Sequence, residues 1–91
     1  MNIKQVYSLT TPNLGEIKAV AIKRVAFSKH FDTWLMYSQN RLFTIDEHDD
    51  LDGKHYQYKA MVCDYCILPE ADAIIKCMEK YGYSIVKLHL I

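Results

Sequence analysis

Glycine and long apolar runs are scarce in this sequence. The three glycines stand alone, so the chain has no glycine-rich loop that could cradle a phosphate. No stretch approaches the roughly 18 consecutive apolar residues that a membrane span requires. The opening residues, MNIKQVYSLTTPNLGE, mix polar side chains throughout, unlike a secretory signal. We therefore expect a soluble protein without an export signal or a membrane partner.

Cysteine and net charge are also low. Three cysteines are an odd number, and without an export signal they favour reduced thiols and a cytoplasmic location over a disulfide framework. Eleven basic residues balance eleven acidic ones, so no overall field attracts nucleic acid or anionic lipid. The charge is uneven, however: residues 1–45 carry six basic and two acidic groups, whereas residues 46–91 carry five and nine. The net charges of +4 and −4 predict a polar surface.

Hydrophobic residues make up 51% of the 91-residue chain, enough for one core and too few for two. The clearest local pattern predicts a helix over residues 69–81. Pro69 suits a first helical position, Glu70 and Lys80 complement the helix dipole, and Gly82 can cap the C-terminal end. An apolar stripe at helical spacing consists of Ala71, Ile74, Ile75, Met78 and Tyr81.

Strand patterns occupy most of the rest. Alternation of period two predicts strands in IKQVYSL, in HYQYKAMVCDY and in the tail YSIVKLHLI, and TTPNLG predicts a turn. Residues 16–28 and 31–43 fit both strand and helix. We favour strand for 16–28, with a bulge near Lys23 and Arg24, because the segment is rich in β-branched residues. For 31–43 we favour two short strands around Gln39 and Asn40.

Together these patterns predict an α+β fold. We expect a small single domain, residues 1–91, with a mainly antiparallel sheet of five or six strands. One C-terminal helix packs on the sheet, and a final strand follows it.

The cysteines could carry chemistry. Cys63 and Cys66 have the C-x-x-C spacing of zinc ribbons and redox sites, and Cys77 follows eleven residues later. Residues three apart on a strand point to opposite faces, so the pair would diverge unless the strand breaks between them. There is no second C-x-x-C, and the pair precedes the helix instead of starting it. We therefore expect small, buried core residues, and we predict no metal and no cofactor; the alternative is a metal-binding protein that uses these cysteines or the acidic residues 46–55.

Residues 46–55, DEHDDLDGKH, hold five carboxylates. An EF-hand alignment on Gly53 would place His48 at the first ligand position and Lys59 where a glutamate is needed, so it fails at both ends. The alternatives are a solvated turn between strands, a looser divalent-ion site, or a negative surface for a basic partner.

Basic and aromatic residues alternate in IKRVAFSKH, which suggests an alternative function in nucleic-acid binding. Its candidate residues are Lys18, Lys23, Arg24 and Lys29. Four cations are few for this purpose, and the acidic half would repel the same polyanion. The four histidines show no local arrangement that defines a reaction, so we predict that the protein is not an enzyme.

These exclusions favour a non-catalytic protein-binding module, a small cytoplasmic inhibitor or regulator that occupies the surface of a partner protein. Small, neutral, motif-poor domains are common among accessory proteins of phages and mobile elements, including inhibitors of bacterial defence. Tyrosine and tryptophan are enriched at interface hot spots. The predicted partner-binding residues are therefore Asp46, Glu47, Asp49, Asp50, Asp52, Trp34, Tyr37 and Tyr56. A homodimer through an exposed edge strand stays open.

Overall fold

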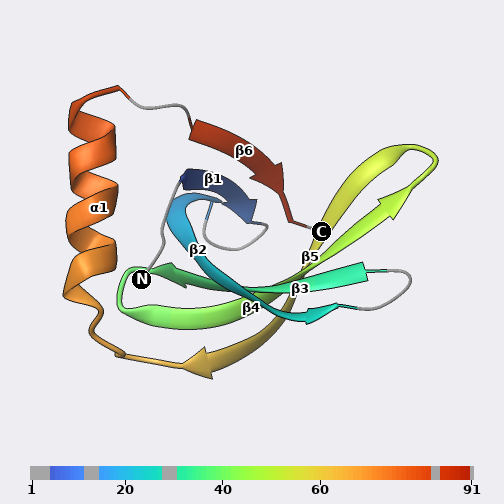
Figure 1. Ribbon diagram of the computed structural model, residues 1–91, viewed down its shortest axis with the longest axis horizontal. Helices are drawn as coiled ribbons and strands as arrows, with labels where there is room; N and C mark the ends of the chain where they lie inside the picture. Colours follow the sequence, from blue (N-terminus) through green and yellow to red (C-terminus); the bar gives the residue numbers. More distant parts are fainter. Residues whose placement is uncertain (1–4, 12–14, 28–30, 83–84, 91) are drawn as a thin grey trace.

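The computed structural model describes residues 5–11, 15–27, 31–82 and 85–90, and it has the predicted α+β architecture (Figure 1). Its elements are β1 (Val6–Thr11), β2 (Gly15–Phe27), β3 (Phe31–Ser38), β4 (Arg41–Asp50), β5 (Gly53–Cys63), α1 (Pro69–Lys80) and β6 (Ile85–His89). The strands form one sheet in the order β5-β4-β3-β2-β1-β6. Every pair is antiparallel except β1 and β6, which run parallel.

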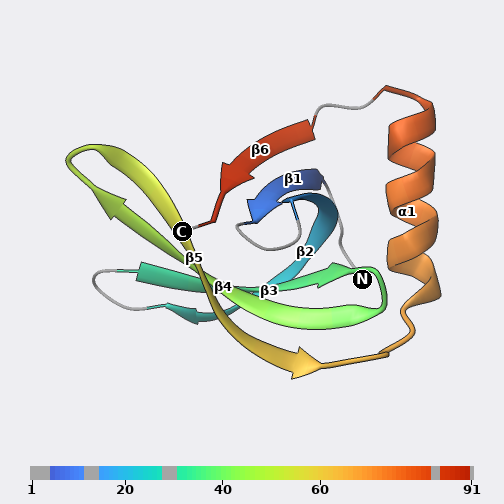
Figure 2. The same ribbon diagram turned by 180° about the vertical axis from the view of Figure 1, so that it is seen from behind.

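The sheet curls so far that its two outer strands approach each other. An isolated parallel bridge joins Tyr56 of β5 to Leu90, just after β6 (Figure 2). Bulges increase the bend and twist of a strand, and the pairing of β2 with β3 shifts register at two places, between Ala21 and Lys23 and between Arg24 and Ala26. The predicted bulge near Lys23 and Arg24 is therefore confirmed. The bulged strand β2 can therefore follow the curvature of the barrel-like sheet.

Apolar residues cover both faces of the curled sheet because successive residues of a strand point to opposite sides. The concave face carries a buried cluster made of Leu9, Ala19, Met36, Phe43, Ile45, Leu88 and Leu90. A second cluster lies between the convex face and α1: Val6, Val20 and Tyr37 come from the sheet, and Ala71, Ile75 and Met78 come from the helix. The alternating strands thus supply one core inside the curl and another under the helix.

Helix α1 begins at Pro69, as predicted, and ends at Lys80. Ala71 is its fully buried residue, and the stripe around it faces the convex side of the sheet. Tyr81 lies outside the helix and is 66% exposed, so its predicted place in the stripe is wrong. The apolar stripe therefore ends one turn earlier than its spacing indicated.

Both ambiguous segments are strands. Residues 31–38 and 41–50 pair with each other in register from Phe31–His48 to Ser38–Arg41. The two residues between them, Gln39 and Asn40, have φ of 51° and 64°. This left-handed pair is what a tight two-residue hairpin requires. The predicted turn is confirmed, whereas most of the predicted TTPNLG turn lies outside the described residues.

Candidate functional site

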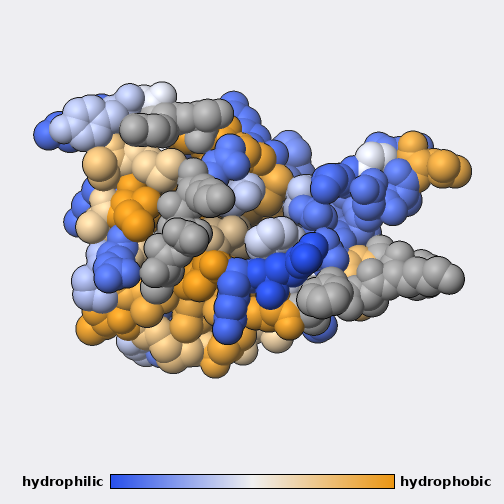
Figure 3. All heavy atoms as spheres, viewed as in Figure 1, coloured by the Kyte–Doolittle hydropathy of each residue, from blue (hydrophilic) through white to orange (hydrophobic). Residues whose placement is uncertain are grey.

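The β4–β5 hairpin carries the acidic segment as an arm that extends from the sheet (Figure 1). Asp50 pairs with Gly53, and the backbone N–H of Asp52 donates to Asp50 Oδ1 at 2.9 Å. Asp49, Asp50 and Asp52 are exposed, and Leu51 at the turn is fully exposed. Figure 3 shows this arm as mainly hydrophilic with a hydrophobic tip. The segment is thus a solvated turn between strands.

Asp46 and Glu47 belong to opposite faces of β4. Asp46 accepts a hydrogen bond from Thr33 Oγ1 at 2.7 Å, and Lys59 Nζ lies 3.9 Å from the same carboxylate oxygen. Glu47 points to the concave side, where it lines a cavity. Their side chains are only 16% and 17% exposed. The five predicted carboxylates therefore form no common surface: three lie at the tip of the arm, and these two are partly buried.

Strand β5 is a sheet edge with little cover on either face. Nine of its eleven residues are exposed. We define the β5 apolar surface as Tyr58, Met61, Val62, Tyr65 and Ile67, which are 46%, 46%, 57%, 81% and 73% exposed. In Figure 3 hydrophobic side chains cover the region of the β5 end and of its connection to α1. Among the described residues, only the Tyr56–Leu90 bridge pairs with the outer side of this strand.

The cysteines differ from the prediction. Cys63 and Cys66 form a disulfide, with their Cα atoms 5.9 Å apart, and neither is fully buried. The expectation of reduced core thiols is wrong because β5 ends at Cys63 and Tyr65 adopts a φ of 61°, which turns the chain back. Cys77 is a free, exposed thiol on α1. The C-x-x-C motif therefore closes the turn that leads from the β5 edge toward the helix.

The basic residues of β2 are divided among separate ion pairs. Lys18 Nζ lies 3.4 Å from Glu16, and Arg24 lies 3.5 Å from Asp32. Lys23 is exposed, and Lys29 lies outside the described residues. Paired cations attract phosphates less strongly than free ones, because the neighbouring carboxylates repel the polyanion. This arrangement gives the nucleic-acid alternative no specific support.

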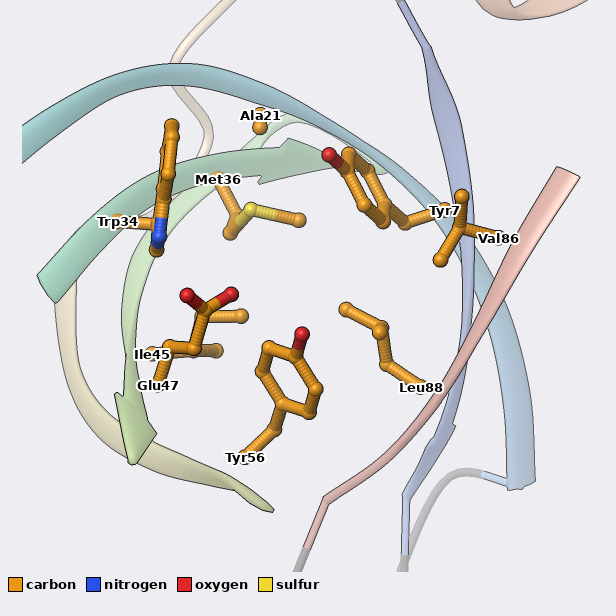
Figure 4. Close-up of a pocket in the computed structure, with 9 residues that line it drawn as sticks. All are labelled: Tyr7, Ala21, Trp34, Met36, Ile45, Glu47, Tyr56, Val86 and Leu88. Carbon is orange, nitrogen blue, oxygen red and sulfur yellow. The ribbon is translucent and has the colours of Figure 1, made fainter. Parts of the chain in front are cut away.

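The predicted aromatic residues separate into two groups. Tyr37 is fully buried beneath α1, so it is no part of an exposed contact surface. Its hydroxyl group donates to Asn40 Oδ1 at 2.8 Å and lies 3.2 Å from Asp72 Oδ2. Trp34 and Tyr56 are half-buried and point into the curl of the sheet (Figure 4). None of the three therefore lies beside the acidic turn on the outer surface.

Inside the curl lies a cavity of about 180 Å³. Figure 4 shows its lining residues: Tyr7, Ala21, Trp34, Met36, Ile45, Glu47, Tyr56, Val86 and Leu88. They come from all six strands. Sequence reasoning missed this cavity, although one signal was present: Glu47 has the parity of Ile45 and Phe43 on β4, so a carboxylate occurs in an apolar series.

Two tyrosines in the cavity have perturbed acidity. Burial, a hydrogen bond with Glu47 and the charge of that carboxylate raise the pKa of Tyr56 to about 12. Burial and the charge of Glu47 also raise the pKa of Tyr7. Both phenols therefore stay protonated and can donate hydrogen bonds across the neutral pH range. At the rim, Lys54 Nζ lies 3.2 Å from Glu47 Oε1, and the lysine side chain is 56% exposed.

No family model, curated protein or solved structure matches this chain. Within the described residues, no three histidine, cysteine, aspartate or glutamate side chains are grouped to hold a metal ion. In the same part of the chain, no helix has the length and apolarity needed to cross a membrane.

Proposed function

We propose that this protein is a non-catalytic protein-binding module, an inhibitor or regulator that acts by covering a surface of another protein. The observation that supports the proposal is the exposure of β5, an eleven-residue edge strand with three large apolar side chains at 46% to 57% exposure. An uncovered apolar edge strand tends to pair with another chain. Exposed apolar patches of this kind commonly mark interaction sites.

The mode of binding that fits this edge is strand addition. An extended segment of the partner would pair with the backbone of β5 beyond Tyr56, where the bridge to Leu90 ends. Main-chain hydrogen bonds would supply affinity, and contacts with the β5 apolar surface would supply specificity. The disulfide at Cys63 and Cys66 holds the turn that presents Tyr65 and Ile67 next to this edge.

Charge favours a basic partner over a second copy of this chain. Asp49, Asp50 and Asp52 lie at the start of the same edge and attract a positively charged surface. Two-fold pairing of β5 with itself would reverse the strand direction and bring this acidic turn toward Asp64 of the other copy. The end of β5 next to Asp64 presents a carboxylate and apolar side chains. Arg41, at the start of β4, already pairs with Asp64 at 3.1 Å.

Affinity capture from the native host, followed by mass spectrometry and a binding assay with the captured protein, tests the proposal. The double variant Val62→Asp/Tyr65→Asp should abolish capture, whereas Val25→Asp should retain it. Val25 is an exposed apolar residue on β2, 42% exposed, and is therefore a matched control. Equal capture by both variants would show that the β5 apolar surface is not part of the interface. Elution of the chain as a self-paired dimer would show that a second copy of this chain, and not another protein, occupies the edge.

The acidic turn has its own test in association kinetics. Reversing Asp49, Asp50 and Asp52 to lysine should lower the association rate with the captured partner roughly tenfold at low salt, and less at high salt. Glu79→Lys on α1 is the control, because it changes charge at an exposed position near the end of the helix opposite to the β5 connection. An association rate unchanged by the triple variant would exclude steering by this turn.

A further inference from the structure

The cavity inside the sheet is large enough for a small molecule. Its volume of about 180 Å³ exceeds the roughly 150 Å³ of an engineered protein cavity that binds benzene. It also communicates with solvent, since Tyr7, Trp34, Glu47 and Tyr56 are all half-buried. Cavities with apolar walls and a few convergent polar groups are typical ligand sites. The cavity shares no lining residue with the β5 apolar surface, so ligand binding there is independent of the proposed function.

Negative charge and aromatic rings define the chemistry of this cavity. Among the described residues that line it, Glu47 is the only one with a carboxylate. In Figure 4 the carboxylate points toward the middle of the cavity, and Trp34, Tyr7 and Tyr56 lie around it on three sides. Aromatic faces attract cations, and the attraction is strongest when the cation is desolvated. The combination favours a positively charged ligand over a neutral or an anionic one.

Lys54 does not fill the role of that cation. Its ammonium group pairs with Glu47 at 3.2 Å, but the side chain is 56% exposed and does not line the cavity. It approaches the carboxylate from the rim. Lys54 therefore compensates the Glu47 charge in part from the rim, and among the described residues that line the cavity there is no cation between the aromatic rings.

An unsatisfied hydrogen-bond donor adds a second requirement. Trp34 Nε1 is buried and has no hydrogen-bond partner. A buried donor without an acceptor costs about 1–3 kcal/mol. Because Nε1 is covered, a hydroxyl or carbonyl oxygen of a ligand can supply the acceptor only when the indole ring turns toward the cavity. The cavity therefore presents a carboxylate and aromatic faces for a cation, together with an N–H group for an oxygen.

We propose that this cavity is a binding site for a small organic cation, an alkylated ammonium compound that carries one hydrogen-bond acceptor. The ammonium group lies against Trp34, Tyr7 and Tyr56 and is paired with Glu47. The indole ring of Trp34 turns on binding, so that its N–H donates to the oxygen of the ligand. The apolar residues Val86 and Leu88 line the β6 side and contact the methyl groups.

Trp34 is the only tryptophan of the chain, so its fluorescence reports directly on the cavity. The probe is choline, and its control is 3,3-dimethylbutan-1-ol, which has the same shape with carbon in place of the charged nitrogen. Choline should change the Trp34 emission in a saturable way and bind at least about tenfold more tightly than the neutral alcohol. This comparison uses the unmodified protein and does not depend on the folding of any variant.

Substitutions at Glu47 and Asp46 then test which carboxylate binds the cation. Glu47→Gln should weaken choline binding about tenfold, because it removes the charge and preserves a hydrogen-bonding group. Asp46→Asn is the matched control: it is the neighbouring carboxylate, and it accepts from Thr33 on the opposite face of β4. Circular dichroism confirms that each variant is folded. Equal affinity for choline and the alcohol, equal loss in both variants, or no fluorescence change at millimolar choline would each overturn the proposal.

Discussion

Glu47 and Tyr56 lie directly opposite each other on β4 and β5, and both side chains line the cavity inside the curl of the sheet. The pair lies next to the Tyr56–Leu90 bridge, where the two outer strands meet. Directly opposed side chains are the closest neighbours across a sheet. One carboxylate thereby connects the cavity, the closure of the sheet and the acidity of two tyrosines.

Stability should fall at alkaline pH because Tyr56 is partly buried and lies opposite Glu47. The pKa of Tyr56 is raised from 10.0 to about 12, so the unfolded chain ionises this phenol first. A group whose pKa is raised on folding contributes to stability, and this contribution is fully present below pH 10 and is lost as the pH rises toward 12. In urea unfolding experiments between pH 9 and 12, the free energy of unfolding should decline less for Tyr56→Phe than for the unmodified protein.

Absorbance titration gives an independent measurement of the same effect. One tyrosine of the unmodified protein should ionise at about pH 12, and Glu47→Gln should lower this step only in part, because burial is the largest cause of the raised pKa and persists in the variant. Tyr65→Phe is the control, since Tyr65 is 81% exposed, and it should remove a tyrosine without changing the late step. A late step that persists unchanged in Glu47→Gln would contradict the assignment.

Tyr37 connects the sheet to the helix, and its removal should be costly. Tyr37→Phe removes the hydrogen bond to Asn40 Oδ1 in the β3–β4 turn and the contact of the hydroxyl group with Asp72 Oδ2 of α1. The expected loss in the free energy of unfolding is about 1–2 kcal/mol by urea denaturation. Tyr81→Phe, at a position 66% exposed, should change it by less than about 0.5 kcal/mol. Similar losses in the two variants would show that the Tyr37 hydroxyl group contributes little.

The fold could be predicted where the signals are local. Pro69 and the acidic first turn mark the start of α1, and the β-branched content of residues 16–27 favours β2 over a helix. The bulge at Lys23 was predictable because the apolar parity of the segment changes there. Each of these features depends on residues close together in the sequence.

The candidate site could not be predicted because it depends on register and curvature. Alternation along β4 separates Asp46 from Glu47, but only the curl of six strands brings Glu47 to Tyr7 and Trp34. The acidic segment looked like a single surface in the sequence, and the pleat of the strand divides it. Whether Tyr37 or Trp34 is covered by α1 likewise depends on which face the helix crosses.

The disulfide predicts a simple labelling pattern. Alkylation of the denatured, unreduced protein should modify one thiol, Cys77, because Cys63 and Cys66 are bonded to each other. After reduction, three thiols should react, and mass spectrometry distinguishes the two states. Reduction should lower the free energy of unfolding by at most about 2 kcal/mol, since the closed loop is short. Three labelled thiols without reductant would contradict the pairing.

The β3–β4 turn offers a route to higher stability. Gln39 and Asn40 both have positive φ, a conformation that asparagine tolerates better than glutamine does. Gln39→Asn should therefore raise the free energy of unfolding by up to about 1 kcal/mol in urea denaturation. Gln57→Asn is the matched control: Gln57 is exposed on β5, where the extended backbone disfavours asparagine, and no gain is expected. An equal gain at both positions would show that the effect does not come from the left-handed turn.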